Sequence, residues 1–137
     1  IPLRLVGSEM CIRDRLTLVD PSAGSGPETF MRLLLRAMGV AYETQVYLEG
    51  VGYVDFVVDG WLIIECDSKE FHEGEKQMQD RERDIAAARL GFITIRPLAK
   101  DILGDQASVR QALEQIIAVL GPRFTDAPRS QFSKKRP

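Results

Sequence analysis

Three acidic residues lie within thirteen positions of one another, in two stretches whose other side chains are typical of buried strands: Asp55, Glu65 and Asp67. An ionised carboxylate in an apolar strand is costly unless it is paired or coordinates a cation. Carboxylate oxygens are ligands that Mg²⁺ and Mn²⁺ prefer, and Mg²⁺ usually takes one or two of them and keeps several waters. Such a cation lowers the pKa of a bound water and stabilises charge on a phosphoryl oxygen. The three residues therefore predict a divalent-metal site suited to phosphoryl chemistry.

The alternative is an acidic patch that nearby basic residues neutralise, for which Lys69, Arg81 and Arg83 are the candidates. Lys69 also continues the alternation of Glu65 and Asp67 along the strand. If the strand runs on that far, Lys69 is placed to contact a scissile phosphate.

The loop at Asp59-Gly60 decides whether Asp55 can join Glu65. A strict two-residue loop would place Asp55 opposite Ile64 and out of phase with Glu65. A three-residue loop or a bulge would place Asp55 opposite Glu65. We predict the second arrangement, and carboxylates on opposite faces of the sheet would exclude the metal site.

His72 is the one histidine of the chain, and it precedes a polar helix that contains Asp80. A His–Asp pair would orient the imidazole for proton transfer to a leaving group. The alternative is a helix laced with salt bridges, which the alternating charges of residues 80–84 would form without any chemistry. Glu28 is the acidic member of a capping-box pattern that begins at Ser25, and this pattern is sufficient to explain it.

Apolar spacing and turn residues predict seven elements in the order α-β-β-β-α-β-α, which indicates an α/β domain. Glycines and prolines at the ends of the apolar runs set most of the boundaries. The expected helices are 25–38, 73–90 and 108–120, and the expected strands are 42–48, 53–58, 61–66 and 92–96.

Length and composition indicate one soluble globular domain, because 137 residues are enough for one core and 45% of them are hydrophobic. The apolar runs are too short to cross a bilayer. Two cysteines do not suggest a disulfide framework, which predicts a reducing, cytoplasmic setting.

We expect residues 1–20 to be a leader that arose by sequence read-through and residues 21–120 to be the folded domain. Residues 121–137 hold five Lys or Arg and one Asp, a net charge of +4. They are expected to be a disordered basic tail, and binding to phosphates is the alternative. Because the chain begins with Ile1, we also expect a further N-terminal domain in the full-length protein.

Five sequence motifs follow one another in an order similar to that of a known family. They are an early helical glutamate, Val-Asp-Phe at 54–56, Ile-Ile-Glu-Cys-Asp-Ser-Lys-Glu-Phe-His at 63–72, Asp-Arg-Glu-Arg-Asp at 80–84 and Leu-Gly-Phe-Ile-Thr-Ile-Arg at 90–96. Over about residues 25–105 the chain resembles the very-short-patch-repair-like endonuclease-domain proteins of the PD-(D/E)XK nuclease superfamily. The resemblance implies a restriction-endonuclease-like fold, with a central mixed four-stranded sheet flanked by helices. It also implies cleavage of DNA phosphodiesters with Mg²⁺ or Mn²⁺.

The resemblance also implies roles for individual residues. Asp55 matches the metal-binding aspartate that opens the motif, and Glu65 matches the acid of the (D/E)XK element. His72 matches the histidine of the repair-like branch, Asp80 the acidic residue on the following helix, and Glu28 the glutamate of the N-terminal helix.

Asp67 departs from the superfamily pattern, which has lysine at this position. Water activation is then left to a second metal held partly by Asp67, to His72, or to a displaced Lys69. Loss of activity is the remaining alternative.

We therefore expect a Mg²⁺-dependent DNA endonuclease that acts in repair, restriction or a mobile element. One alternative is an inactive nuclease fold that binds nucleic acid, and another is a module that regulates an N-terminal domain. The residues expected to contact DNA are Lys69, Lys76 and Arg83, with Arg32 and Arg36 as further basic candidates.

Overall fold

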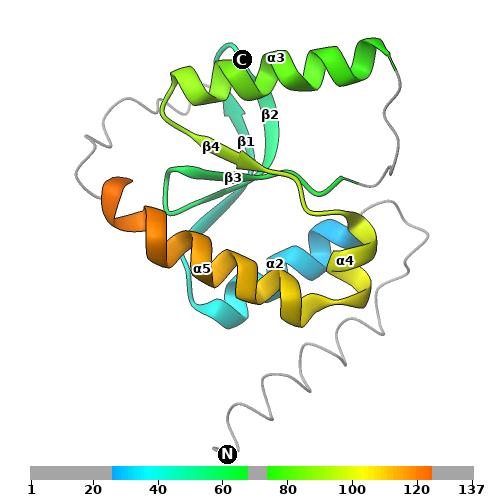
Figure 1. Ribbon diagram of the computed structural model, residues 1–137, viewed down its shortest axis with the longest axis vertical. Coiled ribbons are helices and arrows are strands. Elements are labelled where there is room, and N and C mark those ends of the chain that lie inside the picture. Colours follow the sequence, from blue (N-terminus) through cyan, green and yellow to red (C-terminus); the bar gives the residue numbers. More distant parts are fainter. Residues whose placement is uncertain (1–25, 68–73, 125–137) are drawn as a thin grey trace, which may run out of the picture.

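Four strands form a single mixed sheet in the computed structural model, which describes residues 26–67 and 74–124 (Figure 1). The strands are β1 (Tyr42–Leu48), β2 (Gly52–Val58), β3 (Leu62–Ile64) and β4 (Ile93–Ile95), and they lie side by side in this order. The first three are antiparallel neighbours, whereas β3 and β4 are parallel. A parallel pair needs a crossover connection, and helix α3 (Glu75–Arg89) lies within it.

Helices cover both faces of this sheet (Figure 1). Helix α3 lies on one face, and the opposite face carries α2 (Gly26–Met38), α4 (Ala99–Gly104) and α5 (Gln106–Phe124). The α/β architecture with a mixed four-stranded sheet and flanking helices is therefore confirmed. Within the described ranges no helix has both the length and the apolar character needed to cross a membrane.

Each face of the sheet packs into its own apolar cluster. The larger cluster joins the sheet to α2, α4 and α5, and the smaller one joins it to α3. The fully buried side chains of the larger cluster include Met31, Leu35, Phe56, Ile64, Ile102 and Leu113, and the smaller contains Val54, Val57, Ile63, Ala87 and Phe92. Burial of these side chains supplies the main stabilisation of the fold.

The hairpin between β2 and β3 has the register that the metal hypothesis requires. Phe56 pairs with Ile64, which leaves a three-residue loop between the strands. Asp59-Gly60 lies in this loop with left-handed φ angles of 49° and 78°, which aspartate and glycine tolerate better than most residues. One step beyond the last pair, Asp55 stands opposite Glu65, so the predicted register is confirmed.

The β1–β2 ladder reverses its two faces at Gln45 and Asp55. Residues two apart on a strand normally share a face. Here Phe56 packs into the larger cluster, whereas Val54 packs into the smaller one. Gln45 has a φ of 50°, a left-handed conformation that is uncommon for a residue other than glycine. The side chains of Gln45 and Asp55 meet at this reversal, with Gln45 Nε2 3.5 Å from Asp55 Oδ1.

Two features at the start of the C-terminal helical region were not predicted. Helix α4 has only six residues, too few for apolar periodicity to reveal, although its Ile102 is buried. Helix α5 begins at Gln106, and Asp105 Oδ1 accepts a hydrogen bond from the Ser108 backbone N–H at 3.3 Å. The predicted start at Ser108 is therefore wrong, because Asp105 caps the helix one turn earlier.

The end of α5 also differs from the prediction, which stopped the helix before Gly121. The helix continues to Phe124, whose ring stacks on Trp61 with centroids 4.6 Å apart and an interplanar angle of 5°. A β-carbon added at Gly121 would lie 3.9 Å from Trp61 Cζ2, so the helix passes close to the indole. The proposed tail boundary at residue 121 is thus wrong. The remaining tail, 125–137, and the proposed leader lie outside the described residues.

Replacing Phe124 with alanine should destabilise the protein, because the last turn of α5 would lose its stacking partner. We expect Phe124→Ala to lower the free energy of unfolding by about 1–2 kcal/mol. Urea unfolding followed by the fluorescence of Trp61, the single tryptophan, measures the change directly. Val119→Ala is the matched control, because Val119 lies on the same helix with 65% of its surface exposed. Equal losses in the two variants would contradict the role of the stack.

Candidate metal and phosphodiester site

Asp55 and Glu65 lie where β2 and β3 separate, and their side chains bond to the backbone beyond the last ladder pair. Asp55 Oδ2 accepts a hydrogen bond from the Cys66 backbone N–H at 2.8 Å. The carboxylate of Glu65 accepts one from the Asp55 backbone N–H. The two acids are therefore neighbours, and each is oriented by the opposite strand or its continuation.

Arg83 of α3 is the direct counter-charge of Glu65. Its Nη2 lies 3.0 Å from Glu65 Oε1 and also donates to the Tyr53 carbonyl oxygen at 2.6 Å. Its Nε donates to the Val51 carbonyl oxygen at 3.0 Å. The guanidinium thus joins α3 to β2 and to the end of β3. Arg83 was predicted as a DNA contact and as a neutralising partner, and in this structure its guanidinium contacts Glu65.

A second arginine extends this charge network. Arg96 follows β4 and holds Asp84 of α3 with two hydrogen bonds, of 2.8 Å from Nη2 and 3.4 Å from Nε. Asp80 lies between the two arginines, with Oδ1 4.0 Å from Arg83 Nη1 and 3.9 Å from Arg96 Nη1. Burial lowers the pKa of Arg96, but Asp84, together with Glu65 and Asp80, raises it above its usual value. Arg96 was missed in the sequence, although it closes the last motif of the family resemblance.

Glu28 of α2 approaches the same group of residues from the other face of the sheet. Gln45 Nε2 lies 3.4 Å from Glu28 Oε2 and 3.5 Å from Asp55 Oδ1, so the amide stands between two carboxylates. Burial and the charge of Asp55 raise the pKa of Glu28, against a lowering by Arg32. Gln45 is a site residue that the sequence did not reveal. Its distinguishing feature is its left-handed φ, which is a property of the folded structure.

Burial is also the largest cause of the pKa shifts of Glu65 and Cys66. It raises the pKa of Glu65, as does the charge of Asp55, whereas Arg83 and Arg96 lower it. The pKa of the Cys66 thiol is raised by burial and then by Asp55, Glu28 and Glu65. The thiol is therefore protonated at neutral pH, which excludes a thiolate nucleophile at Cys66.

The other predicted residues are placed less closely. Asp67 continues the parallel register past β3 through a bridge to Leu98, and its carbonyl accepts a hydrogen bond from the Ala99 N–H at 2.9 Å. Lys76 is exposed in the first turn of α3, and Arg32 and Arg36 are exposed on α2. His72 and Lys69 lie outside the described residues.

The donor set for a cation is a pair of carboxylates. Among residues 26–67 and 74–124 no group of three or more His, Cys, Asp or Glu side chains is placed to hold a metal ion. Asp67 is thus not brought together with Asp55 and Glu65 in such a group. Two hard carboxylates with bound waters are nevertheless an ordinary donor set for Mg²⁺. Burial, and to a smaller extent the charge of Asp55, raises the pKa of Glu65, and a bound cation would relieve the repulsion between the two carboxylates.

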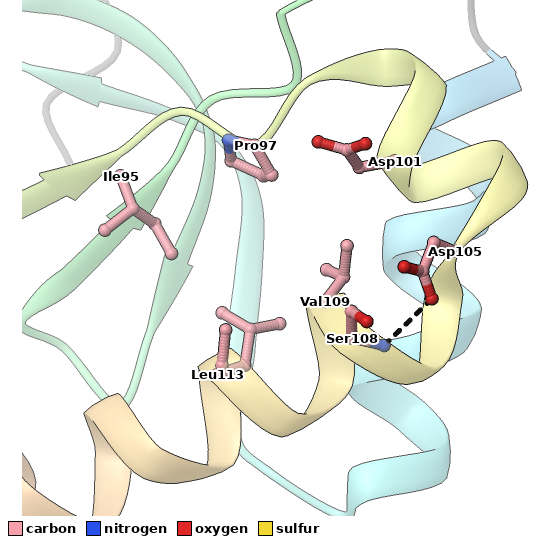
Figure 2. A pocket seen from close by; sticks show the side chains of 8 residues that line it. Ile95, Pro97, Asp101, Asp105, Ser108, Val109 and Leu113 are labelled. Atoms are coloured by element: carbon pink, nitrogen blue, oxygen red, sulfur yellow. Dashed lines mark hydrogen bonds between the residues drawn. The ribbon is translucent and has the colours of Figure 1, made fainter.

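A separate groove of about 380 Å³ lies between the end of β4 and the helices α4 and α5 (Figure 2). Its wall is largely apolar, with Asp101, Asp105 and Ser108 at its polar positions. None of the candidate carboxylates lines it. The groove and the strand-end site are therefore distinct features.

In comparisons with known proteins, the chain matches no protein-family model, no curated protein and no solved structure. The functional argument consequently rests on the chemistry of the site. That chemistry is a pair of oriented carboxylates, a third acid across Gln45, and two arginines.

The raised pKa of Glu28 predicts a particular pH dependence of stability. Between the ordinary value of 4.5 and the raised value, the folded protein binds more protons at Glu28 than the unfolded chain does. Wild-type protein should therefore lose stability relative to Glu28→Gln as the pH rises through this window, and the difference should be constant below it. Urea titrations at a series of pH values measure the difference.

Salt separates the two causes of this effect. Because burial contributes more than the charge of Asp55, most of the pH dependence should survive about 1 M NaCl, where the Debye length falls to about 3 Å. Its disappearance in salt would show that repulsion between surface charges is the larger cause. A pH-independent difference would contradict the raised pKa altogether.

Proposed function

We propose that the chain is a metal-dependent endonuclease that hydrolyses DNA phosphodiester bonds. The observation that carries the proposal is the placement of Asp55 and Glu65 side by side at the point where β2 and β3 separate, each oriented by a backbone N–H. The motif order that resembles the very-short-patch-repair-like branch of the PD-(D/E)XK superfamily supports it, and we propose the restriction-endonuclease-like fold on the same ground. We place the activity in the bacterial cytoplasm, in repair, restriction or a mobile element.

In this proposal each described residue has a chemical task. Asp55 and Glu65 would hold Mg²⁺ or Mn²⁺, and the hydrogen bonds from the Cys66 N–H and from Gln45 Nε2 orient the Asp55 carboxylate for this. The cation supplies a more acidic bound water and stabilises charge on a phosphoryl oxygen. Glu28, whose pKa is raised, is suited to hold or move a proton beside Asp55. The predicted roles of His72, Asp80 and Lys69 remain part of the proposal, whereas Asp67 is not proposed as a third ligand of the same cation.

A second function, a nuclease fold without turnover, is favoured by one specific observation. The charge of Glu65 already has an internal partner in Arg83 at 3.0 Å, so the acid is compensated without a cation. A module of this kind would bind nucleic acid through exposed basic residues such as Arg32, Arg36 and Lys76.

Plasmid cleavage with Mg²⁺ or Mn²⁺ separates the two functions. We expect Asp55→Asn and Glu65→Gln each to reduce cleavage by about 100-fold or more, because each removes a charged ligand. Asparagine at position 55 still offers an oxygen to the Cys66 N–H, so the local fold should survive. Glu114→Gln is the control, because Glu114 lies on α5 and pairs with Arg110 at 2.8 Å.

The outcomes test the proposed ligands and the inactive module separately. Full activity in both site variants would rule out the proposed ligands. Salt-sensitive DNA binding without metal-stimulated cleavage, unchanged by Glu65→Gln, would establish the inactive module instead.

A further inference from the structure

Arg83 occupies a position where it must influence any cation held by Asp55 and Glu65. Its Nη2 is 3.0 Å from Glu65 Oε1, and 32% of its side chain is exposed against 13% for Glu65. One oxygen of this partly buried acid is therefore already engaged by a permanent positive charge. A divalent cation at Glu65 would meet that charge at close range.

Two backbone carbonyl oxygens also hold the guanidinium in place. It donates to the carbonyl oxygens of Val51 at 3.0 Å and Tyr53 at 2.6 Å, both on the chain that leads along β2 to Asp55. Moving Arg83 away would leave these carbonyls and Glu65 without the donor that binds them now. On its outer side Asp80 lies 4.0 Å away and is shared with Arg96. Arg83 is thus anchored more firmly than a surface ion pair.

Like charges in a partly buried site repel strongly, because the effective dielectric constant is well below that of water. The charge of Arg83 consequently opposes a cation even where the guanidinium and the metal contact different oxygens of Glu65. A phosphodiester brings negative charge to the same place and would offset this repulsion.

We propose that Arg83 is an internal competitor that holds down the affinity of the Asp55–Glu65 pair for divalent cations until a phosphodiester is present. The inference rests on the proposed function, since it assumes that this pair binds the metal. Arg83 is in this view a positioning residue that acts through Glu65. Its predicted role as a simple DNA contact would be replaced by control over when the metal is retained.

Calorimetric titration of the full chain with Mn²⁺ tests the proposal without any measurement of activity. Arg83→Gln should bind Mn²⁺ about tenfold more tightly than wild type, or more, because the repelling charge is gone. The direction of the change in Mn²⁺ affinity is informative. If Arg83 had a merely structural role, its removal would weaken Mn²⁺ binding. Arg89→Gln, an exposed arginine on the same helix, is the matched control and should bind as wild type does.

A second measurement includes an arm that uses the wild-type protein alone. Adding a dinucleotide phosphodiester should raise the Mn²⁺ affinity of the wild-type protein several-fold, and the increase should be smaller in Arg83→Gln. Circular dichroism checks that each variant is folded. No effect of the dinucleotide on the wild-type affinity would overturn the proposal.

The remaining outcomes separate this inference from the proposed function. Mn²⁺ binding that is lost in Glu65→Gln but unchanged or weakened in folded Arg83→Gln overturns the inference and leaves the metal site standing. Binding by neither wild type nor Arg83→Gln overturns both. Binding by Arg83→Gln alone would support the internal competitor most directly.

Discussion

The hydrogen bonds of one guanidinium hold together the part of the molecule where chemistry is expected. Arg83 ties α3 to β2 through the carbonyls of Val51 and Tyr53, and it ties both to Glu65 at the end of β3. Strands β2 and β3 have separated at this point, beyond their last ladder pair of Phe56 and Ile64. Side chains connect them here, since Asp55 and Glu65 each bond to a backbone N–H. The same contacts that complete the fold therefore orient the candidate ligands.

The electrostatics of this region follow from where the acids are buried. Glu28, Asp55 and Glu65 approach one another from α2, β2 and the end of β3, and burial is the main cause that raises the pKa of Glu28 and of Glu65. The amide of Gln45 stands between Asp55 and Glu28, and the backbone of Gln45 is left-handed. Strained backbone of this kind is found often at functional sites, where the surrounding structure holds it in place.

The two candidate functions differ in what finally balances the negative charge. A cation at Asp55 and Glu65 would make the group a nuclease site, whereas Arg83 alone would make it a structural ion pair. The Arg83–Glu65 pair is partly buried, with 32% and 13% of the two side chains exposed, so desolvation offsets much of its attraction. An ion pair kept beside two further acids is therefore more easily explained by function than by stability, and this argument favours the nuclease.

Local sequence patterns determined most of the secondary structure and the identity of the two strand-end acids. The predicted β1 matches the observed strand at both ends, and the Asp59-Gly60 turn led to the register that sets Asp55 opposite Glu65. These features depend on neighbouring residues: apolar spacing, turn chemistry and pleat alternation act over a few positions. Asp105, which caps α5 only three residues before Ser108, was missed because two capping patterns compete within one turn.

Only the tertiary structure decided which charges meet and where the last helix ends. Arg83 lies 18 residues from Glu65 and 32 from Val51 in the sequence, and several other basic residues were equally eligible partners. The extension of α5 through Gly121 and Pro122 depends on Trp61, which is far away in the chain. The reversal at Gln45 accompanies the placement of Phe56 and Val54, two residues apart, in different apolar clusters. Such pairings come from packing in three dimensions, and no local spacing encodes them.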